Sequence, residues 1–518
     1  MGTCTIPATD RARRRRGAVA CAAAAAVLST ACPAAPKRDP GLVDLSTAVD
    51  RPVIPAGKTG EVVLKVTVGA RQPPRASRPP LNLGIVVDTS GSMEGKPIED
   101  AREAVADLLG RLREGDRAAL IGFGSVATVL GRGAWESSSP PEEMVEAVGK
   151  IRAEGTTDMR AGLIAAFSET APARDGRHLS RIILLSDGRP NDATGLLDMA
   201  RAAASEAMPI VAFGLGIEFD EALLADMART SGGHYAFLSG SEQIAERFQG
   251  EVLKLETLVA RNVSVEVIPG PNIDALEVVG WDDLSPDRGI VVALGDLVGG
   301  RTREVIVRLA HGERSHDARV ELADVRLRYL DTYGESGFQE KIFYVGARAS
   351  EDPALVEQAA DAAVTDALAA IRANLVAMRA AEAMRRGDLD GAAWTLTVGI
   401  ETYRRTYAGL AEPDLDRRRE FAGMRALEQA AVRADPEGAA LAQADALRAL
   451  DEAGVGALTV PTREAAQRAG MTVATGRGAR SETAAPAEAP PPARNWSPEE
   501  EREILEVHSQ AYGSAYSD

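Results

Sequence analysis

Three short segments of the chain combine carboxylate and hydroxyl side chains in a pattern that suits a hard divalent cation. Asp88, Ser90 and Ser92 alternate in the first segment. Thr157 and Asp187 lie in the other two. Oxygen ligands of this kind are preferred by Mg²⁺, Mn²⁺ and Ca²⁺. The set carries only two carboxylates, which leaves coordination positions for water or for an anionic group from another molecule.

Cysteine and histidine offer no competing metal site in the body of the chain. The three cysteines are Cys4, Cys21 and Cys32, so no thiol follows residue 32. The five histidines include no pair at the i,i+4 spacing of a helical zinc site. These counts exclude a disulfide framework, a Cys-ligated zinc site, an iron–sulfur cluster and a cysteine nucleophile beyond that point.

Apolar strands and amphipathic helices alternate along residues 81–257 and contain the three segments. Leu81–Asp88 is typical of a buried strand, and Arg181–Asp187 is another. The alternation predicts a doubly wound, mostly parallel α/β sheet. Because open parallel sheets place their sites at the carboxyl ends of the strands, we expect the three segments to converge at that edge.

The flanking regions predict separate structures. Residues 258–346 return to a two-residue apolar period, which indicates a β-sandwich. Residues 32–80 are expected to be a linker with strands that join this sandwich, so the α/β domain is either inserted in it or followed by it. Residues 351–455 predict an α-helical hairpin region. Residues 456–518 predict a mostly disordered tail that closes with a short helix over 497–508.

The N-terminus predicts export from a bacterial cell. Residues 1–31 contain a basic stretch followed by the uncharged run Gly17–Ala31, as a signal peptide does. The residues before Cys32 resemble the lipobox of bacterial lipoproteins, although Leu28 stands four residues before the cysteine where the family has three. The resemblance implies lipidation of Cys32 and attachment to the membrane of the cell envelope. The alternative is a plain signal peptide, which gives a periplasmic or secreted protein.

The order and context of the three polar segments resemble the von Willebrand factor type A domain and its metal-ion-dependent adhesion site. The resemblance covers residues 81–255 and includes a T-x₄-G-L spacing that begins at Thr157. It implies a bound Mg²⁺, or Mn²⁺ or Ca²⁺ in its place. The alternative is a type A fold with a vestigial site. The resemblance implies that the direct or nearly direct ligands are Ser90, Ser92 and Thr157. It also implies that Asp88 and Asp187 bind the ion mainly through water.

The arrangement of regions also resembles bacterial exported proteins related to inter-alpha-trypsin inhibitor heavy chains and to calcium-activated chloride channel homologues. These resemblances imply an adhesion or scaffold protein whose metal ion binds an acidic residue of a protein partner. The formal net charge of −17 argues against nucleic acid as a partner. An accessory subunit of an envelope complex or ATPase system is the alternative. We expect no enzyme, because the hydrolase motifs G-x-S-x-G and H-E-x-x-H are absent.

Overall fold

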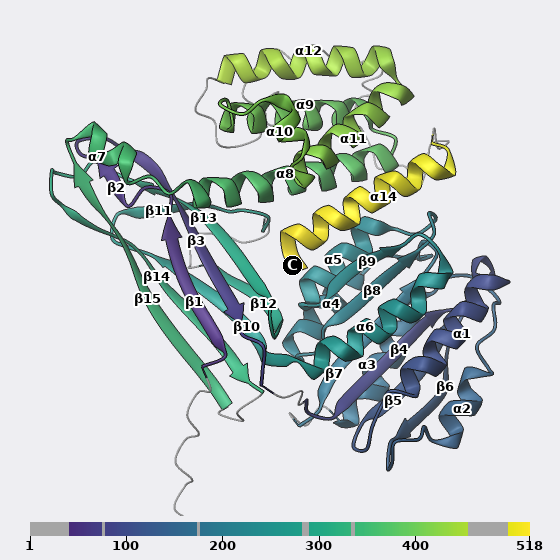
Figure 1. Cartoon of the computed structure of the whole chain (residues 1–518). Helices are drawn as coiled ribbons and strands as arrows, with labels where there is room; N and C mark the ends of the chain where they lie inside the picture. Colours follow the sequence, from purple (N-terminus) through teal and green to yellow (C-terminus); the bar gives the residue numbers. More distant parts are fainter. Residues whose placement is uncertain are drawn as a thin grey trace, which may run out of the picture. The chain divides into compact units, whose positions relative to one another are not determined.

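The computed structural model describes residues 41–74, 78–173, 177–281, 290–332, 337–453 and 496–517. The predicted signal peptide, the candidate anchor Cys32 and the linker predicted before the terminal helix lie outside these ranges. Within them the chain forms an α/β domain, two further β-sheets and a helical region (Figure 1). None of the helices in these ranges is both long and apolar enough to span a bilayer.

Six strands form the sheet of the α/β domain in the order β6-β5-β4-β7-β8-β9. Strand β6 runs antiparallel to β5, and all other neighbours are parallel. This topology confirms the predicted doubly wound, mostly parallel α/β fold. The strands are β4 (Leu81–Asp88), β5 (Arg117–Phe123), β6 (Ala127–Ala134), β7 (Leu179–Ser186), β8 (Ile210–Leu215) and β9 (His234–Leu238).

Helices cover both faces of this sheet, which is why the central strands are mostly apolar and are buried on both sides. Every residue of β4 is buried. Helices α1, α2 and α6 pack on one face, and α3, α4 and α5 pack on the other. Their bounds are α1 (Lys96–Leu109), α2 (Glu142–Val148), α3 (Met159–Thr170), α4 (Leu196–Ser205), α5 (Glu221–Ser231) and α6 (Ile244–Glu256).

Chain segments on both sides of the α/β domain build one β-sandwich. Its sheets have the orders β1-β3-β13-β11 and β12-β10-β14-β15-β2 and share one apolar core. Strand β3 precedes the α/β domain, yet it pairs with β13, which follows that domain, with Val66 opposite Val305. The α/β domain is therefore inserted in the sandwich. The strands are β1 (Val43–Val49), β2 (Val53–Pro55), β3 (Gly60–Ala70), β10 (Leu258–Pro269), β11 (Ile273–Val278), β12 (Ile290–Val298), β13 (Thr302–His311), β14 (Arg319–Asp331) and β15 (Gly337–Ser350).

Both connections to the inserted domain meet at the turn between β12 and β13. Gly300 N donates to the carbonyl oxygen of Ala70, the last residue of β3, at 2.7 Å. Gly299 N donates to the carbonyl oxygen of Thr257, between α6 and β10, at 2.8 Å. The entry and the exit of the inserted domain are thus bonded to the same turn.

The helical region contains more than the predicted hairpin. Helices α8 and α9 form a hairpin that turns at Gly387, whose φ is +80°. Helices α11 and α12 also pack against α9, and α9 lies between α8 and α12 (Figure 1). Alanine-rich helices allow such packing on several sides because their small side chains let neighbouring backbones approach. The helices are α7 (Pro353–Gln358), α8 (Ala362–Arg385), α9 (Leu389–Thr406), α10 (Glu412–Asp416), α11 (Arg419–Ala434) and α12 (Pro436–Ala453).

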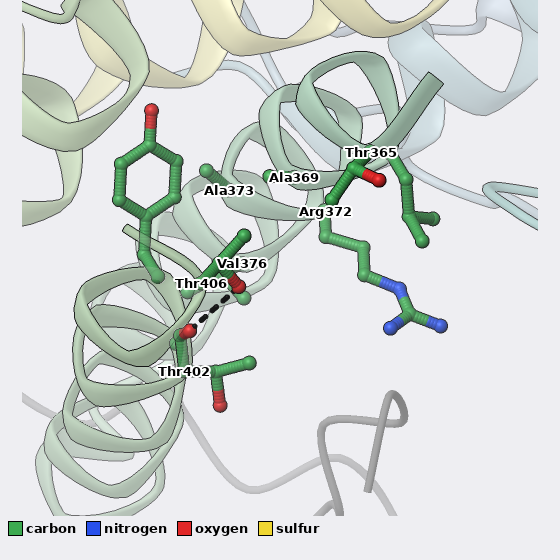
Figure 2. A pocket seen from close by; sticks show the side chains of 10 residues that line it. Thr365, Ala369, Arg372, Ala373, Val376, Thr402 and Thr406 are labelled. Carbon is green, nitrogen blue, oxygen red and sulfur yellow. Dashed lines mark hydrogen bonds between the residues drawn. The ribbon is translucent and has the colours of Figure 1, made fainter. Parts of the chain in front are cut away.

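The contact between α8 and α9 is closest at Gly399. A Cβ atom there would lie 2.5 Å from Val376 Cγ1, so only glycine fits. Beside this contact is a small cavity of about 50 Å³ between the two helices (Figure 2). On its α9 side Thr406 Oγ1 donates to the Thr402 carbonyl oxygen at 3.0 Å, so that hydroxyl is satisfied within its own helix.

The terminal helix α14 (Pro498–Tyr512) is longer than the predicted 497–508. Ser497 and Glu500 form a capping box at its start. Its buried face continues past His508 to Ala511 and Tyr512, which extends the apolar stripe by one turn.

A buried carboxylate links α6 to the sheet of the α/β domain. Glu251 is 2% exposed and accepts from His234 Nε2 and Lys254 Nζ, both at 2.9 Å. Burial lowers the pKa of His234, so at neutral pH the ring donates as a neutral imidazole. Burial would raise the pKa of Glu251, but its contacts with His234, Lys254 and Arg181 outweigh burial and hold that pKa at about 2. His234 therefore has a structural role at the amino end of β9.

This depressed pKa predicts an acid-sensitive contribution to stability. The folded pKa of Glu251 lies below its ordinary value of 4.5, so the stabilisation is present above that pH and is lost as pH falls toward 2. At pH 3 the wild type should have lost about 2 kcal/mol of this contribution, since each pKa unit corresponds to about 1.4 kcal/mol. Denaturant titrations of wild type and Glu251→Gln at pH 7 and pH 3 measure it. The difference in free energy of unfolding between wild type and Glu251→Gln should be smaller at pH 3 than at pH 7. For Glu246→Gln, which changes an exposed residue, the difference from wild type should be the same at both pH values. A difference independent of pH would contradict the prediction.

Candidate metal centre

The carboxyl ends of β4 and β7 bring the two predicted carboxylates to one edge of the sheet. These strands are parallel neighbours, with Val87 opposite Leu185. Strand β4 ends at Asp88, and Asp187 directly follows β7. Both side chains therefore start from adjacent positions at the edge where the loops to α1 and α4 begin.

Hydrogen bonds join these carboxylates to the two serines of the first loop. Ser92 Oγ donates to Asp187 Oδ1 at 2.8 Å, and the Oγ atoms of Ser90 and Ser92 are 2.9 Å apart. Asp88 accepts from Ser90 N at 2.9 Å and from Ser186 Oγ at 2.7 Å. Asp88 is thus fixed from two sides, while the serine hydroxyls face Asp187.

Thr157 faces the same space from the loop before α3. It is 7% exposed. A Cβ atom on Gly188 would lie 3.2 Å from Thr157 Oγ1 and 3.8 Å from Ser92 Oγ, so these two hydroxyls face the same backbone position. Asp158 caps α3 by accepting from Ala161 N at 3.0 Å, which fixes the loop that carries Thr157. The structure therefore brings all five predicted side chains together.

The electrostatics of this cluster favour a cation. Asp88 and Asp187 are 0% and 9% exposed, and neither forms a salt bridge within the described part of the chain. Burial raises the pKa of Asp88. Burial and the nearby charge of Asp88 raise the pKa of Asp187 to about 6. Two buried like charges beside three hydroxyl oxygens fit a hard divalent ion, which would offset their repulsion.

The donor set also defines the kind of ion site. Among the described residues, no group of three or more His, Cys, Asp or Glu side chains is placed to hold a metal ion. The ligand set would instead consist of the two carboxylates and the hydroxyls of Ser90, Ser92 and Thr157. When bound, a divalent ion would supply an electrophilic position for an anionic oxygen from another molecule. The five side chains would hold the ion, and because only two of them are carboxylates, the negative charge around the ion would stay low.

Sequence reasoning missed some supporting residues of the centre. Ser186 Oγ donates to Asp88, although no role was predicted for Ser186 because it lies in a buried strand. Asn191 Nδ2 donates to Thr156 Oγ1 at 2.9 Å and ties the loop after β7 to the loop of Thr157. The available signal for Ser186 was a hydroxyl side chain at the carboxyl end of a mostly apolar strand, directly before Asp187.

The family model of the von Willebrand factor type A domain matches residues 82–250. An uncharacterised protein of Synechocystis sp. is 25% identical over 302 residues, which are 56% of this chain and 71% of that protein. Inter-alpha-trypsin inhibitor heavy chain H1 of Bos taurus is 27% identical over 195 residues, which are 36% of this chain but only 21% of the heavy chain.

A solved structure shares the fold over most of this chain. The von Willebrand factor type A protein from Catenulispora acidiphila matches with a TM-score of 0.54 at 18% identity, over 75% of this chain and 96% of that one. Domains of this family commonly bind a divalent metal ion and take part in protein interactions. These findings confirm the family resemblance of the α/β domain. Residues 82–250 form a von Willebrand factor type A domain.

Proposed function

We propose that this protein binds a protein partner through a divalent ion, Mg²⁺ by preference, held by the five oxygen-bearing side chains of the metal centre. The observation that carries the proposal is the pair of buried carboxylates, Asp88 and Asp187, beside three hydroxyls and without a salt bridge among the described residues. Catalysis is not part of this proposal.

The chain's own residues account for reversible binding. Asp88 is held by Ser90 N and Ser186 Oγ, so it keeps the first loop in place. With two carboxylates, a divalent ion leaves the centre close to neutral, so a carboxylate of a partner can replace water without strong repulsion. Binding should therefore depend on the ion and on an acidic partner residue.

The test is a pull-down with the full chain in Mg²⁺ and in EDTA, beside Asp88→Ala. We expect a partner to be captured by the wild type in Mg²⁺ and lost in EDTA and with the variant. Asp192→Ala is the matched control, because it removes an exposed carboxylate from the loop after β7. Circular dichroism checks that Asp88→Ala is folded. Capture that is indifferent to both EDTA and Asp88→Ala would overturn the metal bridge, and capture of an ATPase under those conditions would favour an accessory subunit.

We also propose that the protein is exported and anchored to the bacterial envelope by lipidation of Cys32. The basic stretch and uncharged run before this cysteine support the proposal. Detergent partitioning of wild type and Cys32→Ala tests it. Membrane association that is unchanged in the variant would remove the case for the anchor.

A further inference from the structure

A cavity of about 510 Å³ with a mixed polar and apolar lining shares Thr89 with the first metal loop and lies at the carboxyl end of β5. Its walls come from Thr89 in the first metal loop, Ser125 in the turn between β5 and β6, and the segment that follows α2 and ends at Gly155. Cavities of roughly 300–1,000 Å³ are the size that accepts small ligands or single side chains of a partner.

The cavity and the metal loop belong to one hydrogen-bonded unit. Glu154 N donates to the Thr89 carbonyl oxygen at 2.6 Å, and Gly91 N donates to the Gly155 carbonyl oxygen at 3.0 Å. Thr89 and Gly91 are the two neighbours of Ser90 in the chain. One wall of the cavity is therefore fixed directly to the backbone on both sides of Ser90, so a segment bound at the metal centre could also reach the cavity.

Glycine keeps the walls of the cavity close together. A Cβ atom on Gly155 would lie 2.6 Å from Ser125 Oγ, and its φ of +87° also favours glycine. Gly124 leaves no room for a side chain against the Glu154 carbonyl oxygen. Val126 and Leu130 add apolar side chains to the lining, and its charged side chains are those of Lys150, Arg152 and Glu154.

Those charges are two cations and one carboxylate. Lys150 and Arg152 are exposed, and neither forms an ion pair within the described ranges. Lys150 Nζ makes only a long bond to the Leu130 carbonyl oxygen, at 3.4 Å. Glu154 is the one acidic lining residue. The rim therefore carries a net positive charge on a chain whose formal net charge is −17.

We propose that this cavity binds a second acidic side chain of the same partner segment whose first carboxylate binds the metal ion. Lys150 and Arg152 would pair with the second carboxylate, while Glu154 limits how strongly it is held. The inference rests on the proposed function and specifies its partner: an extended segment with two acidic residues a short distance apart. Recognition at two points would select such a segment over one with a single acidic residue.

Synthetic labelled peptides test the inference with the full chain in Mg²⁺. One peptide carries a single Asp in a Gly/Ser background, and a series carries two Asp residues at increasing separation. Fluorescence anisotropy should show that one spacing binds roughly three- to tenfold more tightly than the single-Asp peptide, as expected for two solvent-exposed ion pairs. The affinity ratio, that of the best two-Asp peptide over that of the single-Asp peptide, should fall to about one in the double variant Lys150→Ala/Arg152→Ala.

Two further variants test the role of charge at the cavity: one should strengthen binding of the two-Asp peptide, and the other is a control. Glu154→Gln should increase the advantage of the paired peptide, because it removes the negative charge from the rim. Arg189→Ala removes an exposed cation two residues after Asp187 but outside the cavity, and should leave the ratio unchanged. A ratio that survives the double variant, or that falls equally in Arg189→Ala, would overturn the cavity proposal alone. Absence of any Mg²⁺-dependent peptide binding would overturn the proposed function with it.

Discussion

Replacing Asp116 by alanine should lower the free energy of unfolding by about 3–5 kcal/mol, the range found when one partner of a buried ion pair is removed. Asp116 forms a two-pronged pair with Arg78, with both N–O distances at 2.7 Å. The side chains are 1% and 0% exposed for Arg78 and Asp116. Asp116 also accepts from Leu81 N at 2.8 Å and from Arg113 N at 2.8 Å, so the variant leaves a buried guanidinium and two amides without their acceptor. Urea titration monitored by circular dichroism measures the loss.

Two control variants distinguish the cost of leaving one buried charge unpaired from the cost of losing an ion pair at the surface. The double variant Arg78→Met/Asp116→Leu removes both charges and should cost clearly less than Asp116→Ala. Arg132→Ala removes one partner of a pair with Glu169 in which the arginine is 67% exposed, and it should cost less than about 1 kcal/mol. A loss for Asp116→Ala as small as that for Arg132→Ala would contradict the assigned role.

Replacing Asp187 by asparagine should have opposite effects on metal binding and on the stability of the metal-free protein. The Mg²⁺ affinity should fall about 10- to 100-fold, as for loss of a supporting carboxylate at a metal site. In EDTA the variant should be more stable than the wild type at pH 7. The reason is that the folded pKa of about 6 exceeds the ordinary value of 3.8, so an ionised Asp187 destabilises the fold above that pKa. Asparagine keeps an oxygen for the Ser92 hydroxyl and removes the repulsion from Asp88.

Isothermal titration calorimetry with Mg²⁺ and thermal unfolding in Mg²⁺ and EDTA measure these two effects. The stabilisation in EDTA should be about 3 kcal/mol, because the pKa of Asp187 is raised from 3.8 to about 6 and each pKa unit corresponds to about 1.4 kcal/mol. Asp192→Asn changes an exposed carboxylate in the same loop and should alter neither quantity. If Mg²⁺ stabilised Asp187→Asn as much as the wild type, the assignment of Asp187 to the metal centre would be wrong.

The sequence was sufficient for the fold of the inserted domain because its signals are local. Leu81–Asp88 is mostly apolar, and the structure gives a buried strand with the same bounds. Parallel topology then places the ends of such strands at one edge, so the segments of Asp88, Thr157 and Asp187 could be grouped without coordinates.

Features that depend on tertiary contacts were not predictable. Arg78 lies in a turn-rich segment and Asp116 in a loop, 38 residues apart, and both residue types are usually exposed. Only the folded chain shows that they bury each other. The cavity beside the metal centre likewise depends on the close approach of Gly124 to Glu154, two positions without a sequence signal. The packing of α11 and α12 on α9 was missed because an apolar stripe shows that a helix is buried on one side but not which helix covers it.

The turn between β12 and β13 has a mechanical consequence. If a partner binds the metal centre as proposed, tension on the inserted domain reaches the sandwich along the chain through two connections, after Ala70 and at Thr257. Gly300 and Gly299 hold both connections at one turn, so the two strands of chain share the load in parallel. The inserted domain is therefore connected to the sandwich by two chain segments that are bonded to the same turn, and not by a single flexible linker.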